Sequence, residues 1–212
     1  MKKVIICFVL VLSNYLLVSS QVIKVENGLS VSSMNSSKFD LMNGSFYSYS
    51  VLLGCDYWEH PYFYLSSSIG YIKKGGKDNV LLLDSYSQPL QNVTVKGKWD
   101  YLHLNTSFRI KYPIQHSHLY LGAGLKADIL TSSPYFNNML DVEKGYKMES
   151  FIPGMKLETG FNKEIRKLVI GLNASYLIDF NRIGKSILLQ NGTYNYISNS
   201  NTLLFLTLGY KL

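Results

Sequence analysis

Histidine is the side chain best suited to metal or proton chemistry in this sequence, and it occurs four times in 212 residues. His116 and His118 stand one residue apart beside a predicted turn, and His60 stands in another turn. A zinc site in a protein uses three or four side-chain ligands, and no clear third ligand accompanies this pair. His103 is the one candidate for a general base, and no nucleophile is singled out with it. The pattern therefore predicts no metal site, no cofactor and no catalytic residue.

Charged residues of both signs recur at every second position in several stretches, opposite to apolar residues. Alternate residues of a strand point to opposite faces of a sheet, so these charges share one face. If that face is enclosed, opposite charges must pair, because an unpaired buried charge is costly. We predict a network of charges in the lumen of a closed sheet, formed by Lys24, Glu26, Arg109, Lys111, Lys126, Asp128, Lys156, Glu158 and Asp179.

The elements that would position these side chains are strands, because apolar and polar residues alternate with a period of two along most of the chain. Each alternating stretch has about ten residues, the length that a tilted strand needs to cross a bilayer. Eight such stretches are predicted, at 23–31, 47–54, 63–72, 102–112, 119–129, 151–161, 168–179 and 204–212.

The connections between these strands alternate in length. Short connections are predicted at 58–61, 113–117 and 162–166, and long ones at 35–45, 74–98, 131–148 and 181–200. Short turns on one rim and long loops on the other are typical of outer-membrane barrels. The fold predicted is an all-β, eight-stranded antiparallel up-and-down transmembrane β-barrel with short periplasmic turns and long extracellular loops. Two apolar stretches in the loop at 74–98 indicate a hairpin that stands above the membrane.

The first twenty residues read as a secretory signal peptide. Lys2 and Lys3 precede an apolar run over 4–18, and Ser19 and Ser20 supply small residues for cleavage. The expected domains are a signal peptide at 1–20 and an outer-membrane barrel at 21–212. No later stretch is long and apolar enough for a transmembrane helix. Cys55 would remain as a single thiol, so no internal disulfide is expected.

Alternation alone does not decide whether the apolar face meets lipid or a protein core. A soluble exported lipocalin-like barrel that binds a small apolar ligand would turn it inward. Tyrosines near the strand ends favour lipid, as interfacial girdles require. They are Tyr47, Tyr57, Tyr71, Tyr112, Tyr176 and Tyr210. The opposite face mixes Gly and Ser with charges, which suits a narrow lumen.

The sequence resembles the small outer-membrane barrel proteins of the PorT-like type, which share their architecture with the OmpX and OmpA barrels. The resemblance rests on the segment 101–112 (YLHLNTSFRIKY), on 119–125 (LYLGAGL) and on the glycines from Gly154 to Gly160. It implies the fold and an outer-membrane location. It implies no mechanism.

The function expected is a structural or surface-interaction role through the extracellular loops, with a lumen plugged by side chains. A small outer-membrane barrel enzyme is an alternative.

Expected partners are outer-membrane lipid, lipopolysaccharide and a surface or secretion-complex protein, but not nucleic acid. Solvated loop charges are the favoured interpretation of Lys73, Lys74, Lys77, Lys96 and Lys98, and attraction of lipopolysaccharide is the alternative. Aromatic anchors expected in loop contacts are Tyr86, Trp99, Tyr135, Phe136, Tyr146, Tyr194 and Tyr196.

Overall fold

The computed structural model describes residues 20–36, 43–83, 89–132, 135–137, 146–187 and 194–212. The predicted signal peptide, apart from Ser20, lies outside the described residues. Within the described part of the chain, no helix has the length and apolar character needed to cross a membrane.

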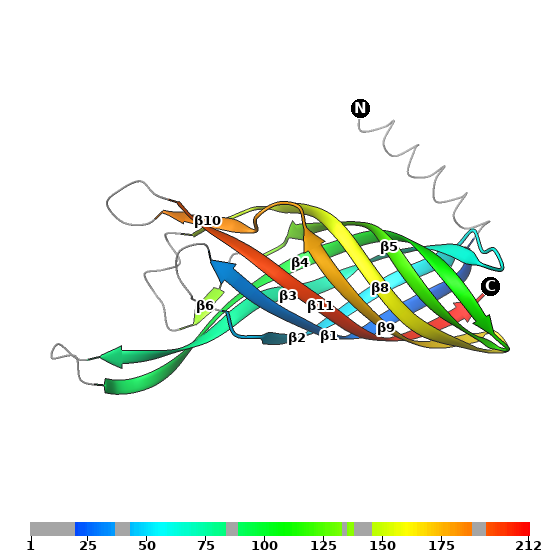
Figure 1. Ribbon diagram of the computed structural model, residues 1–212, viewed down its shortest axis with the longest axis horizontal. Helices are drawn as coiled ribbons and strands as arrows, with labels where there is room; N and C mark the ends of the chain where they lie inside the picture. The colour runs from blue at the N-terminus through cyan, green and yellow to red at the C-terminus, as the bar shows by residue number, and fades with distance from the viewer. Residues whose placement is uncertain (1–19, 37–42, 84–88, 133–134, 138–145, 188–193) are drawn as a thin grey trace, which may run out of the picture.

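Eight long strands pair in chain order and close into a ring (Figure 1). Each strand pairs antiparallel with its neighbours, and β1 pairs with β11 to close the barrel. The eight-stranded antiparallel barrel predicted from the alternation is confirmed. Its strands are β1 (Ser20–Ser36), β2 (Phe46–Tyr57), β3 (Phe63–Leu83), β4 (Pro89–Ile114), β5 (Ser117–Leu130), β8 (Phe151–Ile165), β9 (Leu168–Asp179) and β11 (Tyr194–Lys211).

Three short turns lie at the barrel end that also carries the C-terminus (Figure 1). Two of them connect their strands through only two residues, 115–116 and 166–167, and are shorter than the sequence pattern predicted. The strands gain the difference, and Pro113 lies inside β4 opposite His118. Each turn contains one residue other than glycine in the left-handed region: Trp58, Gln115 and Arg166 have φ of 50°, 51° and 57°. Positive φ is what tight hairpin turns require.

At the opposite end, the β3–β4 ladder continues past the other strands as a two-stranded arm (Figure 1). Its pairing runs from Lys73↔Asp100 to Leu83↔Pro89, so the predicted hairpin in this connection is confirmed. Short strands extend the same end. β6 (Tyr135–Asn137) pairs with β4, and β10 (Gly184–Ile187) pairs with both β11 and β7 (Tyr146–Met148).

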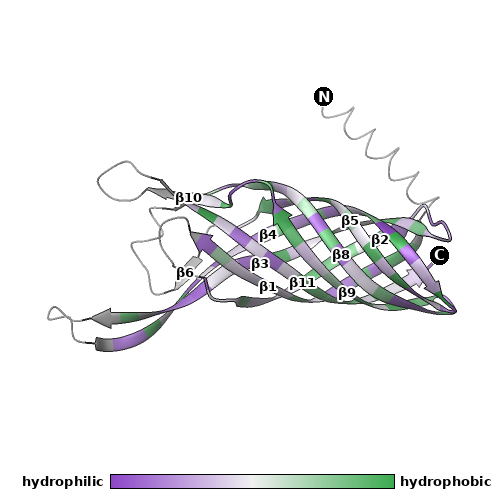
Figure 2. Cartoon of the chain, viewed as in Figure 1, coloured by the Kyte–Doolittle hydropathy of each residue, from purple (hydrophilic) through white to green (hydrophobic). Residues whose placement is uncertain are grey.

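The outward face of the barrel is apolar and the inward face is largely polar. Figure 2 shows the matching alternation of hydrophobic and hydrophilic residues along the strands. Leu121, Leu125 and Leu172 point outward and are 67%, 68% and 62% exposed. Their inward neighbours include Lys126 and Asn173, which are buried. The lipocalin-like alternative, in which the apolar face would line the interior, therefore does not fit this chain.

One part of the interior is apolar, and the sequence pattern did not predict it. Twelve buried side chains form a cluster: Met34, Leu52, Ile72, Val95, Trp99, Tyr101, Ile152, Leu177, Ile183, Ile197, Leu203 and Phe205. Trp99 belongs to this cluster and is fully buried, so its assignment to a loop contact was wrong. The physical reason is that β4 begins before Trp99, and the strand's alternation turns this side chain inward.

Candidate functional site

The lumen holds five cations and five carboxylates among the described residues, and their side chains are almost completely shielded from solvent. They come from seven of the eight barrel strands, every one except β11. The cations are Lys24, Lys74, Arg109, Lys126 and Lys156, and the carboxylates are Glu26, Asp56, Asp128, Glu158 and Asp179. Because the two signs balance, these ten side chains together carry no net formal charge.

One half of this network is organised by Arg109. Its Nε lies 2.7 Å from Oε1 of Glu158, and an Nη atom lies 2.8 Å from Oε2, so the guanidinium binds this carboxylate with two hydrogen bonds. The same guanidinium lies 4.6 Å from the ring centre of Tyr120 and 3.5 Å from Oε1 of Glu26. Arginine suits this position because its fixed fork of donors matches a carboxylate and stacks on aromatic rings.

Two lysines complete the charge pairing around this guanidinium. Nζ of Lys24 lies 2.7 Å from Oδ1 of Asp56 and 3.1 Å from Oε1 of Glu26. Nζ of Lys156 lies 2.8 Å from Oε2 of Glu158. Every one of these cations therefore has a carboxylate within hydrogen-bonding distance, which compensates for the loss of hydration on burial.

The other half is centred on Asp128. Nζ of Lys74 lies 2.7 Å from Oδ2 of Asp128 and 3.0 Å from Asp179, and Lys126 contacts both carboxylates. Nδ1 of His103 lies 2.5 Å from Oδ1 of Asp128. Lys74 was predicted to lie in a loop, as a solvated charge or as one that attracts lipopolysaccharide, and that placement was wrong. It lies on β3 with its side chain fully buried, because β3 extends beyond Ile72 and its alternation turns Lys74 inward.

Neutral polar side chains extend the half of the network around Arg109. Asn105 accepts a hydrogen bond from Lys156 at 3.4 Å and donates one to Ser68 at 2.7 Å. Asn173 donates to Oε2 of Glu158 at 3.0 Å and to the hydroxyl of Tyr120 at 2.7 Å. Side chains that project into the lumen from different strands therefore hydrogen-bond to one another.

The structure places the nine charged residues predicted for the lumen as follows. Eight lie buried in the two halves of the network. Lys111 lies at the mouth beside the turns, where its Nζ contacts Oε1 of Glu59 at 2.8 Å. Asp56 and Lys74 were not predicted as members. Both continue the inward alternation of β2 and β3, so extending each strand by one or two steps would have found them.

The other three histidines lie among the turns, and the rings of His60 and His118 contact other side chains. The ring of His60 stacks on Phe63 with 4.7 Å between centres. His118 contacts Asn162 at 3.2 Å and lies 4.0 Å from Glu164. The described residues contain no group of three His, Cys, Asp or Glu side chains that could hold a metal ion.

The other aromatic residues predicted for loop contacts belong to the end of the barrel that carries the arm. Tyr196 is exposed, and the guanidinium of Arg182 lies 3.9 Å from its ring centre. The backbones of Tyr135, Phe136, Tyr146 and Tyr194 lie in β6, β7 and β11. Tyr86 lies outside the described residues.

Glu59 joins three elements at the turn end of the barrel. Besides Lys111, it lies 3.8 Å from Nζ of Lys211, which in turn lies 3.4 Å from Glu164. Partial burial by itself would raise the pKa of Glu59, but the hydrogen bond and positive charge of Lys111 outweigh it and lower the pKa below its usual value. The pair therefore favours the ionised carboxylate at neutral pH.

Comparisons with known proteins relate the chain to small barrels through structure alone. No protein-family model and no curated protein sequence matches it, so the PorT-like resemblance stays a prediction. Neisserial surface protein A has 15% identity over 90% of this chain and 97% of its own, with a TM-score of 0.47. Outer membrane protein AlkL has 10% identity over 92% of this chain and 90% of its own, with a TM-score of 0.49. Escherichia coli outer membrane protein W has 11% identity over 92% of this chain and 99% of its own, with a TM-score of 0.43. Similarity at this level carries no inference about what this chain binds or does.

We predict that Arg109→Met destabilises the barrel by about 3–5 kcal/mol, because it leaves buried carboxylates without their cation. Urea unfolding of the protein in detergent micelles measures the loss. Arg182→Met, which removes an exposed arginine, is the matched control and should change stability little. Adding Glu158→Gln to Arg109→Met restores the balance of charge and should recover part of the loss. Equal stability of Arg109→Met and the wild type would contradict a structural role for the network.

The contribution of Glu59 to stability should depend on pH. Because its pKa is lowered in the folded state, the contribution is complete above the pKa of the unfolded carboxyl and is lost as the pH falls through the folded value. Glu59→Gln should therefore lower the urea midpoint at neutral pH and have no effect in strong acid. Glu149→Gln, an exposed glutamate outside the strands, is the control. A Glu59→Gln effect that is the same at every pH would rule out this ion pair as its cause.

Proposed function

We propose that this protein is an outer-membrane β-barrel with a structural and surface-interaction role rather than a catalytic one. The observation that carries the proposal is the apolar outward face of a closed ring whose inward face holds charge. Large hydrophobic side chains are exposed on all eight barrel strands. Soluble monomers rarely expose apolar patches larger than a few hundred Å². A bilayer removes the cost of this exposure, and ring closure satisfies the backbone within it.

We infer the orientation of the barrel in the membrane from the different lengths of the connections at its two ends. Short turns and chain termini on the periplasmic side, with longer connections outside, are the usual arrangement in bacterial outer-membrane barrels. The end with the turns 115–116 and 166–167 would then face the periplasm. The β3–β4 arm would stand in the extracellular medium, where it could meet a surface or secretion-complex partner. Export through a cleaved signal peptide at 1–20 belongs to the same proposal.

We also propose that the lumen is closed. An eight-stranded barrel leaves an interior that side chains can fill. Here the ion pairs of Arg109 and Asp128 and the buried cluster around Trp99 and Phe205 occupy successive parts of that interior. The same burial supports a non-catalytic role, because His103, the one candidate base, is fully shielded from any substrate.

The outer-membrane location predicts a heat-modifiable protein. Unheated and heated samples of the outer-membrane fraction, extracted with detergent, should migrate differently on a gel, because an unheated barrel stays folded. The inner-membrane and soluble fractions of the same cells are the controls. Protein found only in the soluble fraction, with one mobility, would contradict the proposal.

A closed lumen predicts no steady ionic conductance. The purified barrel, reconstituted into a planar lipid bilayer, should leave the current at the level of the bare membrane, because no continuous water path crosses the network. A general porin in the same bilayer is the positive control for insertion and recording. A steady step in current with each inserted barrel would show that the side chains do not close the interior.

A further inference from the structure

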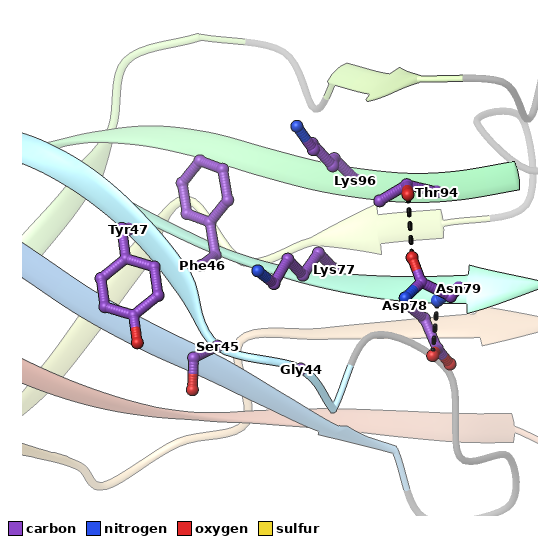
Figure 3. A pocket seen from close by; sticks show the side chains of 9 residues that line it. All are labelled: Gly44, Ser45, Phe46, Tyr47, Lys77, Asp78, Asn79, Thr94 and Lys96. Atoms are coloured by element: carbon purple, nitrogen blue, oxygen red, sulfur yellow. Dashed lines mark hydrogen bonds between the residues drawn. The ribbon is translucent and has the colours of Figure 1, made fainter.

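A groove opens on the outward side of the barrel where β2 leaves β3. Two adjoining hollows of about 460 and 370 Å³ share Phe46, Tyr47 and Lys96 as lining residues. We call this continuous space the lysine groove. It lies between the segment 44–49 and the β3–β4 arm, and Figure 3 shows the larger of the two hollows. Four lysines line it: Lys73, Lys77, Lys96 and Lys98.

The groove forms where the hydrogen-bonded pairing between β2 and β3 is interrupted, and serine side chains occupy some of the places of the missing backbone partners. In the fully described segments 43–57 and 63–83, regular β2–β3 pairing stops at Val51↔Tyr71 and resumes only as one bridge, Gly44↔Lys77. Serine hydroxyls satisfy the carbonyl groups that β2 leaves unpaired. The carbonyl of Lys73 accepts hydrogen bonds from Ser30 and Ser48 at 3.1 and 3.2 Å. Ser32 donates to the carbonyl of Gly75 at 2.9 Å. At these two carbonyl groups of β3, serine hydroxyls therefore replace hydrogen bonds that a β2–β3 ladder would have made.

The charges along the groove favour an anion. Lys77 and Lys96 are direct partners in the β3–β4 ladder, and like charges at directly opposite positions destabilise a sheet unless something lies between them. Both side chains line the same hollow as Phe46, as Figure 3 shows. Nζ of Lys77 also lies 5.8 Å from the ring centre of Tyr47.

Two carboxylates lie close to these lysines. Asp78 lines the groove and accepts a hydrogen bond from the backbone of Asn79 at 2.8 Å. Asp100 pairs with Lys73 in the ladder and accepts a hydrogen bond from Ser132 at 3.1 Å. Four cations against two carboxylates leave the groove with an excess of positive charge.

The surface beside the groove changes from apolar to aromatic along β2, and from apolar to aromatic to cationic along β3 between Ile69 and Lys77. On β3 the outward side chains are Ile69, Tyr71, Lys73 and Lys77, in that order. On β2 the outward side chains run from Leu53 to Tyr47 in the same direction. In a membrane protein, this order marks the passage from acyl chains to polar headgroups. The lysines therefore lie at the level where lipid headgroups carry their phosphates.

We propose that the lysine groove binds the phosphorylated headgroup of lipopolysaccharide in the outer leaflet, with a phosphate held between Lys77 and Lys96. Tyr47 and Phe46 supply apolar contact for the sugar and the first part of the acyl chains. This inference rests on the proposed outer-membrane location. It assigns one bounded site, whereas general attraction to anionic lipid would involve every exposed lysine equally.

The test is isothermal titration of the folded protein in dodecyl maltoside micelles with diphosphoryl lipid A in the same micelles. Lys77→Gln/Lys96→Gln should weaken binding about 25-fold, because each lysine near an anionic lipid surface contributes about fivefold. Lys163→Gln/Lys167→Gln makes the same change of charge at two exposed lysines near the opposite end of the barrel and should bind as the wild type does. Equal binding by both double variants and the wild type would overturn the proposal.

Two further titrations identify the ligand. Dephosphorylated lipid A keeps its acyl chains and should bind as weakly to the wild type as diphosphoryl lipid A binds to Lys77→Gln/Lys96→Gln. Undiminished binding would overturn a phosphate site. Inorganic phosphate at the same phosphate concentration should give no heat of binding, and equal affinity for it would overturn a lipid ligand.

The heat-modifiable mobility of each variant separates the groove proposal from the outer-membrane proposal. A variant that keeps this mobility but loses affinity for lipid A concerns the groove alone. A wild-type protein without this mobility would contradict the barrel in the membrane.

Discussion

Closure of the sheet between β1 and β11 is the constraint on which the rest of the structure depends. Their register runs without interruption from Val22↔Lys211 to Ser36↔Ile197, so the edges at which these two strands meet are paired along that whole length. Only a closed sheet can satisfy every backbone group of a strand in hydrocarbon. Closure also divides each strand into one face that meets the surroundings and one that meets the interior, and no side chain can avoid that division.

The narrow interior explains why the charges are arranged as they are. Lys74 and Asp179 are separated by 105 residues in sequence but share hydrogen bonds of 3.0 Å, because they project from different walls into the same space. Buried ion pairs gain little net free energy over apolar packing, yet breaking one is costly. The network around Arg109 and Asp128 therefore favours one arrangement of the strands, since a shift in register would separate cations from carboxylates.

At the lysine groove, the pairing between two neighbouring strands of the closed sheet is interrupted. Where β2 leaves β3, beyond Val51 toward Gly44, serines on β1 and β2 donate hydrogen bonds to two carbonyl groups of β3 that lack a ladder partner. A cationic surface then becomes accessible where the apolar outward face ends. Lys73 and Lys74 are adjacent in sequence, but one lines this groove and the other lies buried beside Asp128. That difference follows from strand geometry, since the two residues have the same chemistry.

Much of the fold could be predicted because alternation is a local signal. A period of two, interrupted at regular intervals, identified the eight strands and the face on which Lys126, Asp128, Lys156 and Glu158 lie. The errors occur where strands extend beyond the clear pattern. Trp99 and Lys74 were assigned to a loop because the β3–β4 arm lacks strong alternation, and only its pairing shows that both lie within strands.

The sequence by itself determined that this chain forms a closed antiparallel barrel, with an apolar face and a charged face, because both properties follow from the order of residues within each strand. The tertiary structure decided which carboxylate meets which cation, where Trp99 and Phe205 join a buried cluster, and that Lys77 and Lys96 stand opposite each other beside Phe46. The physical reason is that partner choice depends on the register between strands. Register is set by the pairing of the whole ring, and no single strand contains that information.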